Sequence, residues 1–173
     1  MPEELPEFLP SHPQDMRKRG WEQLDILLVT GDSHVDHPAF PANLLGRWLE
    51  AHGFRVGLIA RPRLQDPADV ARLGRPRLFV GMTAGAIDSM VANRTALGKI
   101  RSDDAYAPGG KAGGRPDRCL TVYGHLLRQA FGKEVLLVAG GLEASLRRFA
   151  HYDYWSDKVR RSLLMVRGAD GLV

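Results

Sequence analysis

The side chains best suited to chemistry form a short run of carboxylates and imidazoles near the N-terminus. Residues 31–38 read Gly-Asp-Ser-His-Val-Asp-His-Pro, which places Asp32, His34, Asp36 and His37 within six positions. Such groups bind divalent metals, and they also serve as general acids and bases. Asp and His are equally common in turns, where their side chains hydrogen-bond to loop amides. The run leaves two interpretations open, a metal-dependent hydrolase and an ordinary turn.

Part of the same run resembles the Asp-x-His-x-x-Gly pattern of cobalamin-binding domains, with Asp32 and His34 in place. His37 stands where that pattern has glycine, so the small residue beside the bulky corrin ring is missing. This departure disfavours axial ligation by His34. No Gly-x-Gly-x-x-Gly fingerprint follows residue 30, which argues against a dinucleotide site. A cobalamin-like module is therefore kept only as an alternative.

Two glycine-rich segments add further candidates. Gly140-Gly141, two positions before Glu143, would let a ligand approach the backbone at the start of a helix, or would simply let a strand and a helix pack. The loop at 101–110 carries Asp103, Asp104 and Tyr106 beside flexible glycines. Such a loop suits a lid that orders over a partner, and a solvated surface loop is the competing interpretation.

A basic and aromatic stretch occupies residues 145–161. Aromatic rings interleaved with arginines stack on bases and neutralise phosphates, which would suit RNA. The same residue types also build seams between domains, because Tyr and Trp bury large areas and Arg pairs with carboxylates. We favour the seam. Its candidate contact residues are Arg147, Arg148, His151, Tyr152, Asp153, Tyr154, Trp155 and Asp157, followed by Lys158, Arg160 and Arg161.

The composition limits the class of protein that carries these groups. The chain has 173 residues, 44% hydrophobic and 25% charged, with a net charge of +4, as in an ordinary globular protein of about one domain. No apolar run approaches the length of a membrane span, and the acidic, proline-rich start lacks a signal pattern, so we expect a cytoplasmic protein. The single cysteine, Cys119, supports neither a disulfide nor a cysteine-ligated cluster, and it is expected to be a small buried hydrophobe.

Hydrophobic periodicity places the candidates on an alternating series of elements. Residues 1–20 are expected to form an extended arm, followed by an α/β domain over 21–173. Strands are predicted at 25–30, 55–60, 77–80, 134–139 and 169–173, and helices at 42–52, 67–73, 84–91, 117–131, 143–149 and 157–165. The helix at 42–52 carries Leu44, Leu45, Trp48 and Leu49 on one face. The last predicted strand ends with the chain, as in a truncated protein.

Alternating strands and helices predict right-handed crossovers and a doubly wound, mostly parallel sheet of about five strands. The fold is expected to be flavodoxin-like or Rossmann-like, similar to cobalamin-binding domains. Ligands of such sheets bind beyond the carboxyl ends of the strands. The turns at 31–32, 81–85 and 140–141 follow three predicted strands, so we expect them to share one edge.

Four longer strings carry a specific resemblance. They are Val-Thr-Gly-Asp-x-x-Val-Asp-His-Pro, Arg-Ser-Asp-Asp-Ala-Tyr-x-Pro-Gly-Gly, Gly-Gly-x-Glu-Ala-Ser-Leu-Arg-Arg and Ala-His-Tyr-Asp-Tyr-Trp-Ser-Asp. From about Phe8 to the last residue, the chain resembles the amino-terminal region of the YgiQ family of radical S-adenosylmethionine (SAM) proteins. His34 departs from that pattern, where an aromatic residue such as Tyr is expected.

The resemblance implies a radical SAM barrel downstream of Val173, in which a Cys-x-x-x-Cys-x-x-Cys motif ligates a [4Fe–4S] cluster that binds S-adenosylmethionine. This chain lacks the motif, so by resemblance it is an accessory domain or a truncated product, inactive alone. The implied partners are the barrel in cis and an unknown substrate, RNA or protein. No catalytic residue is assigned and no metal ligand is expected in this chain. The residues expected to face a ligand are Asp32, Asp36, His37, Asp103, Asp104, Tyr106, Gly140, Gly141 and Glu143.

Overall fold

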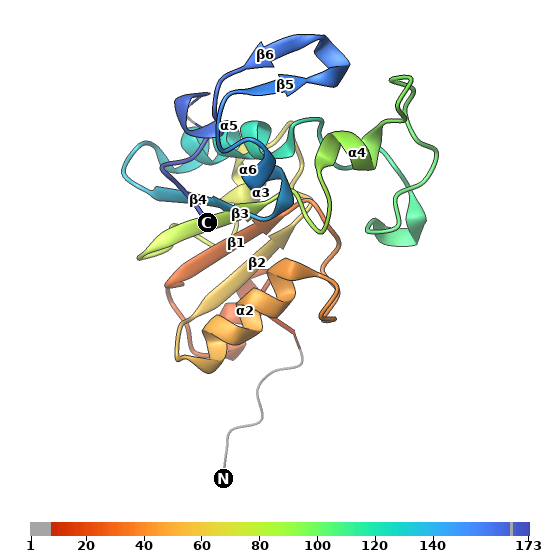
Figure 1. Cartoon of the computed structure of the whole chain (residues 1–173). Helices are drawn as coiled ribbons and strands as arrows, with labels where there is room; N and C mark the ends of the chain where they lie inside the picture. The colour runs from red at the N-terminus through yellow and green to blue at the C-terminus, as the bar shows by residue number, and fades with distance from the viewer. Residues whose placement is uncertain (1–7, 167) are drawn as a thin grey trace.

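A five-stranded, all-parallel sheet forms the centre of the computed structural model, which describes residues 8–166 and 168–173 (Figure 1). The strands are β1 (Ile26–Thr30), β2 (Val56–Ala60), β3 (Phe79–Thr83), β4 (Leu136–Gly140) and β7 (Gly171–Leu172). Their order is β2-β1-β3-β4-β7, with every neighbouring pair parallel. This is the flavodoxin-like order 2-1-3-4-5, so the predicted fold class is confirmed.

The helices cover the two faces of the sheet unequally. They are α1 (Pro13–Lys18), α2 (Pro41–Ala51), α3 (Pro67–Val70), α4 (Ser89–Asn93), α5 (Cys119–Phe131) and α6 (Leu142–Leu146). On one face, Leu27 and Val29 of β1 pack with α3 and α5 in the larger apolar core. On the other face, Ile26 and Leu28 pack with α2 in a smaller core. None of the helices in the described part of the chain is long and apolar enough to cross a membrane.

The carboxyl half departs from strict alternation. A short antiparallel hairpin, β5 (His151–Asp153) paired with β6 (Lys158–Arg160), replaces the helix predicted at 157–165. A single 3-10 turn, Leu163–Val166, follows it. Asp157 adopts a positive φ of 49° in the hairpin turn, and Asp153 accepts hydrogen bonds from Arg118 and Arg160. These pairings with residues outside the segment favour the hairpin over local helix formation.

Smaller corrections concern element ends. The third strand runs from Phe79 to Thr83 rather than over 77–80, because the backbone N–H groups of Arg77 and Leu78 bond to residues that precede β1. The helix predicted at 84–91 begins only at Ser89, where the carboxylate of Asp88 caps it. Three other predicted helices end early, at Val70, Leu146 and, by one residue, Ala51.

The N-terminal arm predicted at 1–20 is only partly extended. Residues 1–7 lie outside the described residues, and α1 forms further on, at Pro13–Lys18. Leu9 is buried beneath α2, where Gly46 has no room for a side chain because a Cβ would lie 2.3 Å from a methyl carbon of Leu9. The backbone carbonyl of Pro10 accepts a hydrogen bond from Leu58 of β2. The described part of the arm therefore packs against the sheet.

The orientation of α2 differs from the prediction. The helix buries Ala42, Asn43, Gly46 and Glu50 rather than its most apolar side chains. Three residues of the predicted apolar face, Leu44, Leu45 and Trp48, are exposed by 55%, 46% and 57%, whereas the fourth, Leu49, is half-buried against the smaller core. Close packing at Gly46 and the buried ion pair between Glu50 and Arg19 set this orientation.

Candidate functional site

The turns that follow β1, β3 and β4 lie at one edge of the sheet, as predicted, although the last two begin later than expected because Gly81 belongs to β3 and Gly140 ends β4. In the strand register, Thr30 of β1 pairs with Thr83 of β3, and Thr83 pairs with Gly140 of β4. These residues end their strands, so the turns at 31–32, 84–85 and 141 all open at the carboxyl edge. From β1 the chain crosses to β2 on one side, and from β2 it returns to β3 on the other side. The gap between β1 and β3 is therefore the switch point, where such folds bind ligands.

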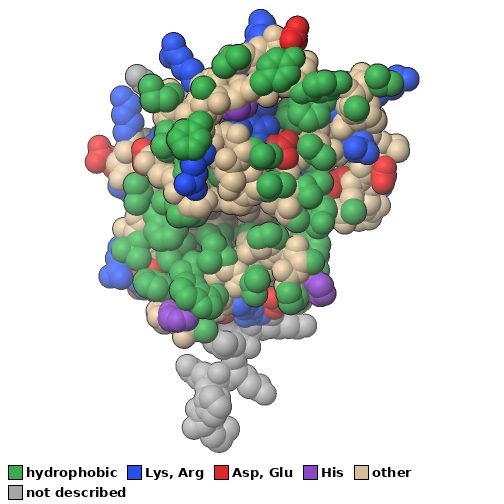
Figure 2. Space-filling model, in the orientation of Figure 1, with side chains coloured by type: hydrophobic (Ala, Val, Ile, Leu, Met, Phe, Trp, Pro, Cys, Tyr) green, Lys and Arg blue, Asp and Glu red, His purple; other side chains and the backbone are tan. Residues whose placement is uncertain are grey.

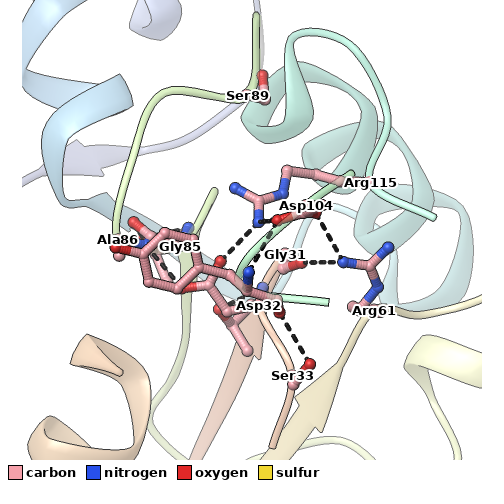
Figure 3. Close-up of polar contacts among 12 residues, drawn as sticks. Gly31, Asp32, Ser33, Arg61, Gly85, Ala86, Ser89, Asp104 and Arg115 are labelled. Carbon is pink, nitrogen blue, oxygen red and sulfur yellow. Dashed lines mark hydrogen bonds and ion pairs between the residues drawn. The ribbon is translucent and has the colours of Figure 1, made fainter. Parts of the chain in front are cut away.

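A buried ion-pair network fills this switch point (Figure 3). The Asp32 carboxylate accepts hydrogen bonds from the backbone N–H of Ala86 at 2.7 Å and from Nη2 of Arg115 at 2.8 Å. The same Nη2 lies 3.3 Å from both carboxylate oxygens of Asp104, and Nη1 of Arg61 lies 3.1 Å from Asp104. Asp32, Asp104 and Arg115 are all buried. The network therefore joins the turn after β1, the end of β2 and the long loop between α4 and α5.

The turn after β3 is shaped to admit the Asp32 carboxylate. Gly85 has a φ of 114°, and a Cβ there would lie 1.9 Å from a carboxylate oxygen of Asp32. Burial raises the pKa of Asp32, while the N–H of Ala86 and the guanidinium of Arg115 oppose this rise. The network contains two arginines and two aspartates, so their charges balance. We call Asp32, Arg61, Asp104 and Arg115 the clamp, because they hold the loop between α4 and α5 against the edge of the sheet. Two nitrogens of Arg115, Nε and Nη1, are buried without a hydrogen-bond partner among the described residues.

The loop predicted to be a lid is docked on this clamp. The carbonyl of Tyr106 accepts hydrogen bonds from the backbone N–H of Ser33 at 2.9 Å and from its hydroxyl at 2.8 Å. The Tyr106 ring packs edge-on against Phe40, with ring centroids 5.8 Å apart. Asp104 points inward, whereas Asp103 is exposed and forms a backbone bridge with Lys111.

The four side chains considered as metal ligands do not converge. Asp32 is buried in the clamp, whereas Asp36 and His37 lie in an exposed loop. Asp36 pairs with Arg47 at 2.6 Å, which lowers the pKa of its carboxyl, and Nδ1 of His37 accepts from the N–H of Ala39. Among residues 8–166 and 168–173, no three His, Cys, Asp or Glu side chains form a group that could hold a metal ion. The geometry therefore gives the metal-dependent hydrolase no support.

His34 does not join the clamp either. Its ring packs edge-on against Phe8, with ring centroids 5.9 Å apart, and burial lowers its pKa. Its Nε2 atom is buried without a hydrogen-bond partner in the described structure. The partial cobalamin pattern thus has its Asp32 locked to Arg115 and its His34 packed beside the N-terminal arm.

Glu143 faces the interior and connects two helices. Its carboxylate accepts hydrogen bonds from the backbone N–H of Ser89 at 2.9 Å and of Leu120 at 3.1 Å. These N–H groups belong to the first turns of α4 and α5, which a carboxylate stabilises. Gly140 ends β4, and Gly141 adopts a φ of 85° just before α6.

A basic cavity beside the β5–β6 hairpin brings together part of the predicted contact stretch. It measures about 400 Å³ and is lined by Arg118, Thr121, Arg147, His151, Lys158, Val159, Arg160, Arg161, Leu163 and Val166. Arg118 and Arg160 share the carboxylate of Asp153, and Arg147 pairs with Asp88. Lys158 and Arg161 have no ion-pair partner among the described residues. The lining thus carries more positive than negative charge.

Asp153 is the anchor of this basic cluster. Burial alone would raise the pKa of its carboxyl, but hydrogen bonds from Arg118, Ser156 and Arg160 outweigh that effect and lower the pKa to about 2. The carboxylate therefore stays ionised at neutral pH and fixes two of the guanidinium groups that line the cavity.

The other predicted contact residues form the outside of the hairpin. Tyr152 and Tyr154 are exposed, and the Tyr152 hydroxyl donates to Asp157 at 2.6 Å. Nε1 of Trp155 donates to the carbonyl of Thr95, which ties the hairpin to the long loop. Arg148 is exposed, and its carbonyl accepts from Ser162.

Sequence reasoning missed the cationic partners of the buried carboxylates. Arg61 and Arg118 adopt positive φ angles of 47° and 52°, and Arg115 lies in the glycine-rich loop. A buried aspartate requires a cation or a hydrogen-bond donor beside it, so an aspartate expected to be buried indicates that such a partner exists without saying which residue it is. The choice among the arginines depends on tertiary placement.

The donors of this chain do not fit the iron–sulfur cluster that the family resemblance implies. Such clusters are held by several cysteine thiolates, and the sequence has one cysteine. Cys119 is fully buried at the start of α5, and desolvation raises its thiol pKa well above the usual value.

Comparison with known proteins gives a consistent result. Residues 8–173 match the family described as Radical SAM N-terminal. Proteins named UPF0313 protein align with 96% of this chain at 58% identity in Thermotoga maritima, 57% in Geobacter sulfurreducens and 55% in Vibrio cholerae. The chain covers 29%, 27% and 21% of the length of these relatives, respectively. No solved structure matches it.

Proposed function

The chain belongs to the Radical SAM N-terminal family, and from this membership we propose that it is the accessory domain of a longer radical SAM protein. In this proposal the cluster and S-adenosylmethionine bind elsewhere in the full-length protein. The domain contributes its carboxyl edge, which faces the catalytic barrel and holds part of the substrate.

The observation that carries the proposal is the basic cavity beside the hairpin. It lies on the carboxyl side of the sheet, since the hairpin follows α6, which itself begins directly after β4 (Figure 1). Five lysine and arginine side chains line it, and only three of them pair with a carboxylate of the residues that the structure describes. A cavity with unpaired positive charge suits an anionic substrate or an acidic surface of a neighbouring domain.

The clamp at the switch point supports the same assignment in a different way. In a free-standing ligand-binding domain of this fold, the switch point would hold the ligand. Here Asp32, Asp104 and Arg115 fill it. The network fixes the long loop as a rigid wall of the carboxyl edge, as a surface that docks on another domain requires.

A second candidate function is RNA binding. Tyr152 and Tyr154 are exposed by 60% and 58% next to the unpaired Lys158 and Arg161. Exposed rings beside basic side chains stack bases and neutralise phosphates. In a radical SAM protein, RNA binding at this surface would make RNA the substrate. The accessory-domain proposal and the RNA-binding proposal therefore use the same surface and differ in the ligand that it binds.

The test uses the full-length protein. A photo-crosslinking residue at Val159, which is 75% exposed on the hairpin, is expected to capture peptides from the cluster-binding part of the same molecule. The matched control carries the photo-crosslinker at Lys133, which is exposed before β4 at the opposite edge of the sheet, and should not capture them. Deleting residues 8–173 should leave the iron content unchanged. Capture from Lys133 alone, or loss of the cluster on deletion, would contradict the proposal.

A further inference from the structure

One face of the sheet is only half covered. All five residues of β1 and four of β2 are buried, since helices or the arm cover both faces. In β3 and β4 burial alternates: Val80 and Met82 are buried towards α5, whereas Phe79, Gly81 and Thr83 are only half-buried on the other face. Parallel sheets normally have both faces covered by helices. Within the described part of the chain, the outer strands therefore lack a covering element on the α2 side.

An apolar groove marks the missing cover. It measures about 410 Å³ and lies between α2 and the outer strands. Leu45 and Leu49 of α2 form one wall, Phe79 and Gly81 of β3 form the floor, and Val138 of β4 and the final Val173 complete the lining. Figure 2 shows hydrophobic side chains around the hollow in the middle of this face. The exposed part of α2, including Leu44 and Trp48, extends the apolar surface.

The topology explains why the described connections between strands leave this face uncovered. Only the connection from β1 to β2 runs towards one edge of the sheet, and it carries α2. The connections from β2 to β3, β3 to β4 and β4 to β7 all run towards the other edge. Right-handed crossovers place these three connections on the opposite face, with α3 and α5. A cover for β3 and β4 on the α2 side must come from outside these connections.

We propose that the groove between α2 and the outer strands is the seat of an amphipathic helix, supplied by the chain that follows residue 173 in the full-length protein. Its apolar side chains would fill the space between Leu45, Phe79 and Val138. Relatives that align with 96% of this chain are more than three times as long, and a protein of that length would supply further chain for this groove.

The position of the last residue favours this occupant over a second copy. The N–H of Val173 bonds to the carbonyl of Ala139 beside β4, and its side chain lies in the groove wall. A segment that continues from this point is tethered at the groove. Its effective concentration is of millimolar order, above that of a second molecule under ordinary conditions.

The experiment compares the full-length protein with the 173-residue chain by cysteine labelling. Leu45→Cys and Val138→Cys are treated with a maleimide and quantified by peptide mass spectrometry, with Arg63→Cys on the α3 side as the exposed control. We expect labelling at 45 and 138 to be about tenfold slower in the full-length protein, since the site must open before it reacts. Labelling at 63 should be equal in the two proteins.

A crosslink identifies the occupant. A photo-crosslinking residue at position 45 of the full-length protein should capture a peptide from beyond residue 173 of the same molecule, as shown by mixing isotopically heavy and light protein. Equal labelling at position 45 in both proteins would overturn the proposal, because the groove would then remain open. Heavy–light crosslinks, or protection that rises with the concentration of the full-length protein, would also overturn it in favour of a second copy. None of these readouts depends on the basic cavity or on activity.

Discussion

At the scale of single residues, Arg115 matters most to the carboxyl edge. Among the residues that the structure describes, it is the only cation that forms an ion pair with Asp32; it also pairs with Asp104, and all three side chains are buried. A buried pair adds little net stability compared with apolar residues of the same size. Removing one member costs far more, because an unpaired charge then stays in the interior.

We expect Arg115→Met to lower the free energy of unfolding by about 3–5 kcal/mol, since it leaves Asp32 and Asp104 without their shared partner. Urea unfolding at neutral pH measures the change. The control, Arg63→Met, removes an exposed arginine and should change stability by less than about 1 kcal/mol. Adding Asp32→Asn to Arg115→Met should recover part of the loss, because Asp104 keeps Arg61 as its partner and the uncompensated charge left by Arg115→Met is that of Asp32. Equal costs for both arginine variants would contradict this role.

Residue types alone revealed only part of the candidate site. Asp32 is a candidate because of the carboxylates and imidazoles after the first strand, and Asp104 because of the glycine-rich loop that suits a lid; the structure brings the two together through Arg115. Asp36 and His37, equally suitable by type, lie in the exposed loop. The spacing of these residues does not predict which of them are buried in the clamp and which are exposed. That depends on which side of the turn after β1 faces the loop that carries Arg115.

At the scale of elements, three strands were predictable from their apolar sequence, whether the strand is fully buried, as in β1, or its burial alternates, as in β4. The predicted strands at 25–30, 55–60 and 134–139 are continuous apolar runs, and each matches an observed strand to within two residues at either end. The hairpin was not predictable in this way. Residues 157–165 favour a helix locally, and the ion pairs of Asp153 with Arg118 and Arg160 tie the segment into a hairpin instead.

The stability of this hairpin should depend on pH in the acid range. Asp153 has a pKa of about 2 in the folded protein, against an ordinary value of 3.8. Its ion pairs then contribute about 2 kcal/mol, fully present above about pH 4 and lost as the pH falls through 2. Asp153→Asn should lower the free energy of unfolding by about that amount at neutral pH. The difference from wild type should shrink below about pH 4.

Urea unfolding from neutral pH down to about pH 2 measures this difference, and carbon NMR of the Asp153 carboxyl gives its pKa directly. A carboxyl that titrates near its ordinary value, or a deficit in Asp153→Asn that stays constant with pH, would show that the pairs do not hold the hairpin.

At the scale of the whole molecule, charge and apolar surface lie in different places. Five lysine and arginine side chains line the cavity beside the hairpin, at the carboxyl edge, and two of them have no ion-pair partner in the described part of the chain. The uncovered apolar surface lies between α2 and the outer strands. The sequence indicated the first through its basic aromatic stretch. It gave no sign of the second, because Leu44, Leu45 and Trp48 have the pattern of a core-facing helix and only the packed structure shows them exposed.

The separation of the two surfaces makes the charged one testable in the isolated chain. With a net charge of +4 and an unpaired Lys158 and Arg161 in the cavity, the chain should bind single-stranded RNA with an affinity that falls as salt rises. Each phosphate contact contributes about 0.7 to the slope of log affinity against log salt for a single strand. Lys158→Ala with Arg161→Ala should therefore reduce that slope by about 1.4, since both substitutions remove unpaired charges without exposing a buried partner.

The control, Leu44→Ser with Trp48→Ser on the apolar surface, should leave the slope unchanged. Fluorescence anisotropy across a salt series measures the wild type and both variants. An affinity that does not respond to salt, or equal slopes for the cavity variant and the wild type, would mean that phosphates do not reach the cavity, and the contact with an acidic neighbouring domain would then be the better account of its charge.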